Sequence, residues 1–185
     1  LIITAPVEEV ASDMGRVQVV HATATAPEVE VYVTAPNADI NTSSPLGSFA
    51  YKASLGPVSV PTGDYQIRVT PKDTKSVVFD SGTVALAGGS DLIIAAVANT
   101  KGGDAPIQLV VLDGTTSSVI TDKNTPAMVR VVHVSSDAPA VDVIVNDAFT
   151  APLVEDLAYV AFTPYVDVMA DTYNIKVVPA DTQTD

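Results

Sequence analysis

The chain has 185 residues, of which 47% are hydrophobic and 17% charged, a balance that predicts a folded core and excludes a disordered chain. Its formal net charge of −13 repels phosphate backbones, so we expect no nucleic-acid partner. The absence of cysteine excludes disulfides, thiol catalysis and cysteine-ligated metal. The longest apolar run, Leu92–Ala98, is far shorter than the ~20 residues that span a bilayer, so we expect no membrane insertion.

Apolar and polar residues alternate along most of the chain, which is the pattern of half-buried β-strands. After an N-terminal extension, residues 1–14, alternating runs begin near Val17, Val29 and Tyr65, and Pro and Gly turns separate them. No segment shows a helical period. We therefore predict an all-β, Ig-like antiparallel β-sandwich. The alternation predicts a buried set: Val17, Val19, Val31, Ile67, Val69, Ile93 and Leu109.

An internal repeat divides the chain. Residues 17–33 align without gaps with residues 129–145 and share nine identities, which place His21 on His133. Residues 50–74 align in the same way with residues 158–182 and share eleven identities, including Tyr65 with Tyr173. Two blocks in the same order indicate a duplicated unit, and the repeat length is that of a domain.

The repeat sets the expected domain boundaries. The first β-sandwich module covers residues 15–113, a polar linker covers residues 114–126, and the second module covers residues 127–185. Nothing in the second module aligns with residues 78–114, so we expect only the first half of a sandwich there.

Four segments resemble successive landmarks of the family known as domain of unknown function 4397. They are residues 129–143 (VRVVHVSSDAPAVDV), residues 17–22, residues 58–65 (VSVPTGDY) and residues 84–90 (VALAGGS). Members of this family are typically exported prokaryotic proteins with tandem modules. The resemblance implies a β-sandwich and an extracytoplasmic location, in the periplasm, at the cell surface or secreted, and it implies no activity.

His21 and His133 are the only histidines. Each ends a strand and enters a loop closed by Ala-Pro, at Pro27 and Pro139. We interpret each as a half-buried ring that hydrogen-bonds loop backbone and fixes the turn, because buried polar groups need partners. The alternative is a ligand contact made once per module; one histidine per module cannot form a metal site alone.

Acidic residues in the second module suggest calcium, because hard cations bind clustered oxygens. Asp137, Asp142 and Asp147 lie close in sequence, but Asp142 sits on a strand, Asp147 in a turn, and no Asp-x-Asp-x-Asp-Gly spacing occurs. We therefore predict no metal site and no cofactor. A second acidic set could meet at a junction between modules: Glu8, Glu9, Asp113 and Asp122.

Tyr65 and Tyr173 each follow a turn and resemble the corner tyrosines of β-sandwiches, so we predict a structural role for them. Sugar-binding modules usually present exposed aromatic rings, and this chain has no Trp and only 5% aromatic residues. Neither histidine has a serine–acid pairing in the sequence, and no Gly-x-Ser-x-Gly motif occurs. We predict no catalytic residues and no enzymatic activity.

The preferred hypothesis is a non-catalytic, extracytoplasmic module for adhesion, spacing or assembly. The alternative is a carbohydrate- or small-ligand-binding module that uses the end loops of the sandwich. A half sandwich exposes its inner faces and strand edges, so we expect the first module, a protein partner, self-association or an inserted strand such as Leu1–Thr4 to cover the second module. The alternative is that the chain is a fragment of a longer protein. The residues expected to need cover are Val131, Val143, Val166, Val168, Ile175 and Val177.

Overall fold

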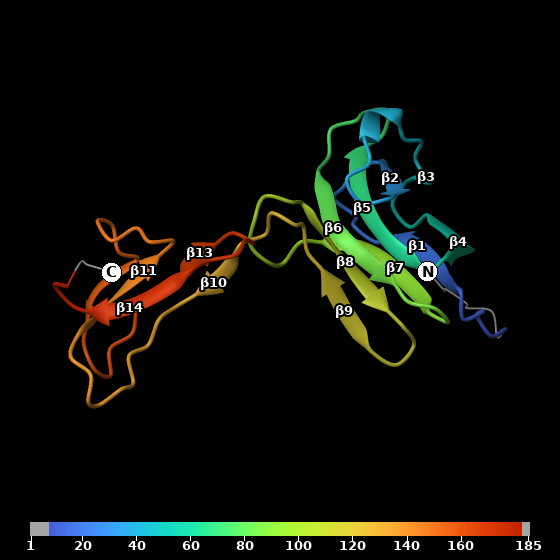
Figure 1. The fold of residues 1–185 in the computed structure, drawn as a ribbon. Helices are drawn as coiled ribbons and strands as arrows, with labels where there is room; N and C mark the ends of the chain where they lie inside the picture. Colours follow the sequence, from blue (N-terminus) through green and yellow to red (C-terminus); the bar gives the residue numbers. More distant parts are fainter. Residues whose placement is uncertain (1–7, 183–185) are drawn as a thin grey trace. The chain divides into compact units, whose positions relative to one another are not determined.

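The computed structural model describes residues 8–182 and is built of β-strands with one short 3-10 helix, Ile40–Thr42. It divides into two compact units, residues 1–125 and residues 126–185, which are treated separately below (Figure 1). The segment Leu1–Thr4, expected as a candidate inserted strand, lies outside the described residues. No helix in the described part is long and apolar enough to cross a membrane.

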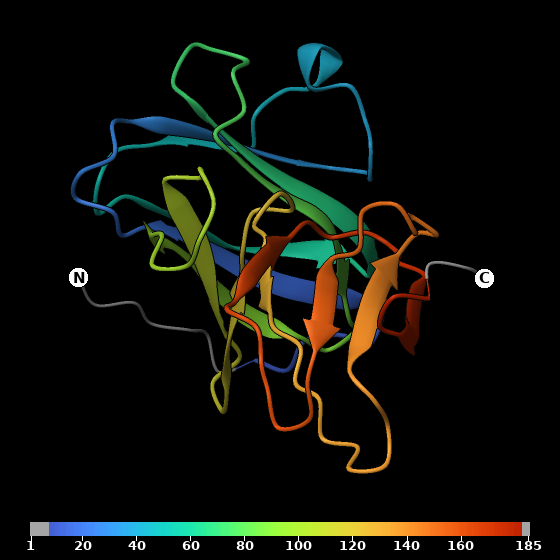
Figure 2. The same cartoon turned by 90° about the vertical axis from the view of Figure 1, so that its left-hand side faces the viewer.

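The first unit is a β-sandwich of two sheets, which form separate layers in Figures 1 and 2. One sheet contains, in spatial order, β4 (Ser54–Pro61), β1 (Met14–His21), β7 (Asp91–Ala98), β8 (Ile107–Leu112) and β9 (Ser117–Ile120). The other contains, in spatial order, β3 (Gly47–Phe49), β2 (Val29–Thr34), β5 (Gly63–Pro71) and β6 (Phe79–Leu86).

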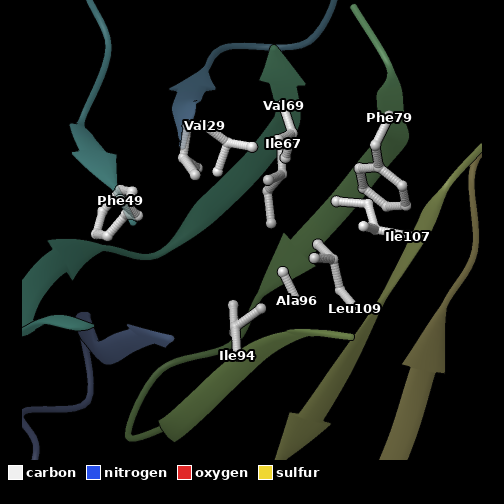
Figure 3. Packing of buried hydrophobic residues seen from close by; sticks show 10 residues of the cluster. Val29, Phe49, Ile67, Val69, Phe79, Ile94, Ala96, Ile107 and Leu109 are labelled. Atoms are coloured by element: carbon white, nitrogen blue, oxygen red, sulfur yellow. The ribbon is translucent and has the colours of Figure 1, made fainter. Parts of the chain in front are cut away.

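Burial of the alternating apolar residues holds these sheets together. Valine and isoleucine favour strands because their branched side chains pack on a pleated surface. Side chains from both sheets meet in one cluster, in which Phe79 of β6 and Val69 of β5 are almost fully buried (Figure 3). The other buried members are Val29, Val31, Phe49, Ile67, Ile94, Ala96, Ile107 and Leu109.

Three expectations for the first unit differ from the structure. Ile93 and Val19 are half-buried and outside the buried cluster, whereas their neighbours Ile94 and Val20 are buried. Both runs carry apolar residues on both faces, so alternation could not fix which face points inward. The predicted linker, residues 114–126, contains strand β9, which pairs with β8 and completes the first unit. The sandwich is also not wholly antiparallel, because β1 pairs in parallel with β7.

The second unit has two small sheets. One pairs β10 (Ala127–Val129) with β13 (Val166–Val168), and the other has the order β12 (Val154–Leu157), β11 (Val141–Val145), β14 (Ile175–Pro179). This three-strand order corresponds to β3, β2, β5 of the first unit. Between β14 and residue 182 no further strand is described.

The core of the second unit is small. Val143, Val154 and Leu157 form its buried cluster. Of the residues expected to need cover, Val143 is buried, Val131 and Val168 are half-buried, and three are exposed: Val166, Ile175 and Val177.

Candidate functional site

The His21 ring is buried and bonded at both nitrogens. The backbone N–H of Thr23 donates to Nδ1 over 3.3 Å, and Nε2 lies 3.2 Å from the carbonyl oxygen of Pro27. Because Nδ1 accepts a hydrogen bond, the proton of the neutral ring resides on Nε2, which donates to Pro27. The ring thus spans the loop that joins β1 to β2, and neither nitrogen is free to bind a metal or substrate while the loop keeps this conformation.

His133 has the same arrangement in the second unit. The backbone N–H of Ser135 donates to its Nδ1 over 3.3 Å, and its Nε2 lies 2.9 Å from the carbonyl oxygen of Pro139. Pro27 and Pro139 therefore act through their carbonyls, which accept a hydrogen bond from the imidazole N–H. The sequence placed the two histidines and prolines in equivalent loops, but it gave no means of identifying the backbone donors.

A second turn packs on each histidine. The Tyr51 ring meets His21 edge-on at 6.4 Å, and the backbone N–H of Lys52 donates to the His21 carbonyl over 2.9 Å. Tyr159 meets His133 at 6.3 Å, and Val160 N–H donates to the His133 carbonyl over 2.8 Å. Each histidine thus joins three segments of its unit: a strand end, the loop that follows it and this turn.

This turn requires a left-handed backbone. Lys52 has φ 71° and its aligned residue Val160 has φ 66°. A β-branched side chain in this region is strained, because its Cβ crowds the backbone. Val160 is exposed, so no packing of its side chain compensates for that strain. The hydrogen bond to His133 holds the turn in place.

The two corner tyrosines bond backbone near their own turns. The hydroxyl of Tyr65 donates to the carbonyl of Pro61 over 2.7 Å, and that of Tyr173 donates to the carbonyl of Met169 over 2.9 Å. In both cases the acceptor lies four residues before the ring. The bond closes the turn that leads into β5 or β14.

The acidic residues of the second unit bond separate partners. Asp142 accepts from the backbone N–H of Asp156 over 2.8 Å, and Asp147 pairs with Lys176 over 2.9 Å. Ser135 donates to Asp137 over 2.9 Å, and this bond lowers the pKa of Asp137. Within residues 8–182, no group of three or more His, Cys, Asp or Glu side chains is placed to hold a metal ion.

Two of the acids expected at a junction, Asp113 and Asp122, bond groups within the first unit. Asp113 accepts from the N–H and hydroxyl of both Thr115 and Thr116, bonds that lower its pKa far below the ordinary range. Asp122 accepts from the backbone N–H of Asp80 over 2.7 Å.

A buried polar network fixes the end of the first unit, and sequence reasoning missed it. Burial opposes ionisation of Asp80, but hydrogen bonds from Gln66, Lys123 and the N–H of Gly82 outweigh it and lower the pKa of Asp80. Lys123 reaches Asp80 over 2.9 Å, which fastens residues after β9 to β6. The signal in the sequence is the acidic residue inside a strand, Asp80; nothing in the spacing connects it with Lys123.

Exposed aromatic rings occur in the second unit, although the composition argued against a sugar platform. Phe162 and Tyr165 are both exposed. The guanidinium of Arg130 lies 5.0 Å from each ring centroid, which is a cation–π distance. Because the cation occupies a face of each ring, these rings do not form an open stacking surface.

Comparisons with known proteins give a family and no nearer relative. The model of a family described as a domain of unknown function (DUF4397) matches residues 15–125 and again residues 127–185. No curated protein and no solved structure matches the chain.

Proposed function

This chain belongs to the DUF4397 family, and from that premise we propose that it is a non-catalytic assembly module that works outside the cytoplasm. Its second unit accepts extended segments from outside residues 126–185, which complete a sandwich like that of the first unit. The single observation that carries this proposal is that no strand of the second unit covers the face of β14 that carries Ile175 and Val177.

Burial of aligned residues differs sharply between the two units. In β5 of the first unit, Ile67 and Val69 keep 8% and 1% of their surface exposed, because β6, β7 and β8 contribute to the same core. Their aligned residues in β14, Ile175 and Val177, each keep 63% exposed. Burying one such side chain stabilises a protein by about 1.5–3 kcal/mol. The free energy available to a partner that covers both is therefore substantial.

The first unit indicates the chemistry of that partner. The strands that cover Ile67 and Val69 lie in residues 78–114, which contain β6, β7 and β8. A partner should therefore present extended segments with aliphatic residues on one face, able to pair with strand edges, as in β-augmentation. A second copy of this chain cannot donate β7 without opening its own core, since β7 lies between β1 and β8. The better donor is a segment whose strands are not already part of a folded core.

The roles proposed for the histidines are consistent with a module that does no chemistry. The rings of His21 and His133 each bond loop backbone at both nitrogens, an arrangement that fixes the loop in one conformation. The extracytoplasmic location is supported by the family resemblance. Fractionation of the source cells tests it directly: we expect the protein outside the cytoplasm, and recovery in the cytoplasmic fraction would contradict the location.

The binding experiment titrates a synthetic peptide of residues 78–114 into the full chain by isothermal calorimetry. We expect saturable binding at one peptide per chain. Val177→Asp in the chain should abolish binding, because it places a charge on the face to be covered. Ile94→Asp in the peptide should do the same.

The matched control is Val160→Asp, the same substitution at an exposed turn of the same unit. It should bind the peptide as the unaltered chain does. Binding that survives Val177→Asp, or no binding at all, would overturn the proposal. If light scattering finds a dimer that Val177→Asp converts to a monomer, the occupant is a second copy, and the foreign partner is wrong.

A further inference from the structure

The core of the first unit contains a pocket of about 480 Å³ between its two sheets. This volume lies within the range of sites that hold small molecules, ~300–1,000 Å³. Interiors of proteins are ordinarily packed as densely as organic crystals, with few voids larger than a water molecule. A space of this size is therefore a feature of this sandwich that its structural role alone does not require.

The pocket is open at one end of the sandwich. Inward-facing residues at the opposite end, such as Val69 and Phe79, are almost fully buried. Lining residues near the starts of β1, β5 and β7 are only half-buried: Val17, Tyr65 and Leu92. Leu46 and Val58 also line the pocket and keep 41% and 36% of their surface exposed. Solvent thus reaches the pocket from this end, and a ligand can enter there.

The lining is aliphatic. Valine, leucine and isoleucine from both sheets dominate it, and the polar side chains that line it are those of His21, Tyr65 and Ser118. His21 and Tyr65 already bond loop carbonyls, so they offer little to a polar ligand. A sugar buried here would leave its hydroxyls without partners, which is costly. A hydrocarbon chain has no polar groups, so its burial leaves no hydrogen bond unmade.

The open end is acidic, whereas charges of both signs occur at the closed end. Asp64, Asp91 and Asp113 lie within two residues of the lining residues Tyr65, Leu92 and Val111. The cation of that end, Arg16, is bonded to Asp91. The lysines described in the first unit all lie in loops or after strands at the opposite end: Lys52, Lys72, Lys75, Lys101 and Lys123. A carboxylate or phosphate at the entrance would be repelled.

We propose that the first unit binds an aliphatic chain between its sheets, with an uncharged or cationic head group at the acidic entrance. A water molecule takes a share of about 30 Å³, so the pocket holds roughly 16 groups of that size. A single unbranched alkyl chain of about 12 carbons, whose methylenes are of similar size, fits this space with room for its head group.

A bound chain would also fill the space between the two sheets. Solvent that enters this pocket meets aliphatic side chains, and removing such surface from water stabilises a protein. A bound chain restores the missing contacts. This inference is independent of the assembly proposed for the second unit, since all lining residues belong to the first.

The test uses the full chain and the uncharged fluorescent probe N-phenyl-1-naphthylamine, which brightens in apolar sites. We expect saturable binding of one probe per chain and displacement by dodecan-1-ol and dodecylammonium. Dodecanoate, which has the same chain length and an anionic head, should displace the probe more weakly. Asp64→Lys should improve displacement by dodecanoate, because it reverses a charge at the entrance.

Two variants fill the pocket from opposite sheets: Val111→Phe in β8 and Val84→Phe in β6. Each should weaken probe binding by at least about tenfold, because the new ring takes the ligand's space. The melting temperature should hold or rise, since filling a cavity stabilises a core. The matched control is Val119→Phe on the outer face of β9, which should leave binding unchanged.

Three results would overturn the proposal. The absence of saturable probe binding, or equal binding by the filled variants with the fold intact, would refute binding of an aliphatic chain. The third result is displacement by dodecanoate as strong as by the alcohol. The last result would refute the head-group assignment alone. A negative result in the probe-binding test would not bear on peptide binding by the second unit, so the two proposals are tested separately.

Discussion

Replacing His21 with alanine should destabilise the first unit by about 1–3 kcal/mol. The substitution removes the acceptor for the Thr23 N–H and the donor to the Pro27 carbonyl, and each lost hydrogen bond is worth about 1 kcal/mol net. It also removes a buried ring that meets the edge of Tyr51. Water that enters the vacated space would hold the cost at the lower end of the range.

Calorimetric unfolding gives the change in stability, and hydrogen exchange gives its location. We expect faster exchange at Thr23 and Lys52, whose N–H groups bond the His21 ring and carbonyl. His133→Ala is the matched variant and should place the same effect in the second unit. Binding of any ligand should be nearly intact. Loss of binding with unchanged melting would refute the structural interpretation of both histidines.

Three further predictions concern other features of the two units. The folded state lowers the pKa of Asp80, so the stability that its carboxylate contributes is present above the ordinary pKa of 3.8 and is lost as pH falls through the lower pKa of the folded state. Asp80→Asn should therefore flatten the acid side of the stability–pH curve. An unchanged curve in acid titration would contradict this. Val160→Asn should raise the stability of the second unit by about 1 kcal/mol by relieving left-handed strain, and a lower melting temperature would argue against that strain. Tyr65→Phe should cost about 0.5–1.5 kcal/mol in denaturant unfolding through the lost bond to the Pro61 carbonyl, and no loss would show that the bond is not stabilising.

Alternation predicts the strands whose two faces differ in environment. The patterns at Val29–Thr34 and Gly63–Pro71 indicated β2 and β5, because one face of each carries core residues. Alternation failed at Ile93, where both faces of β7 are apolar. Composition failed at β9, because its serines made the strand look like part of a linker, although pairing with β8 fixes it.

Some site residues could be predicted from the sequence, but their hydrogen-bond partners could not. The histidines, prolines and corner tyrosines stood out because the repeat conserved them between the two halves of the chain. Their bonds could not be predicted, because the partners are backbone groups that every residue carries. The pocket left no trace in the sequence, since Leu92 and Val111 are as apolar as residues of a filled core.

The open face of β14 is the central claim, and hydrogen exchange of residues 175–179 tests it most directly. β14 pairs with β11 along one edge, and Pro179 has no N–H, so the amides to follow are those of residues 175–178 that point to the other edge. In the chain alone these amides should exchange quickly, because that edge is unpaired in the described structure. A saturating peptide of residues 78–114 should slow their exchange, and the peptide carrying Ile94→Asp should not. Amides that are already protected in the chain alone, or that exchange equally fast with the peptide bound, would contradict the account.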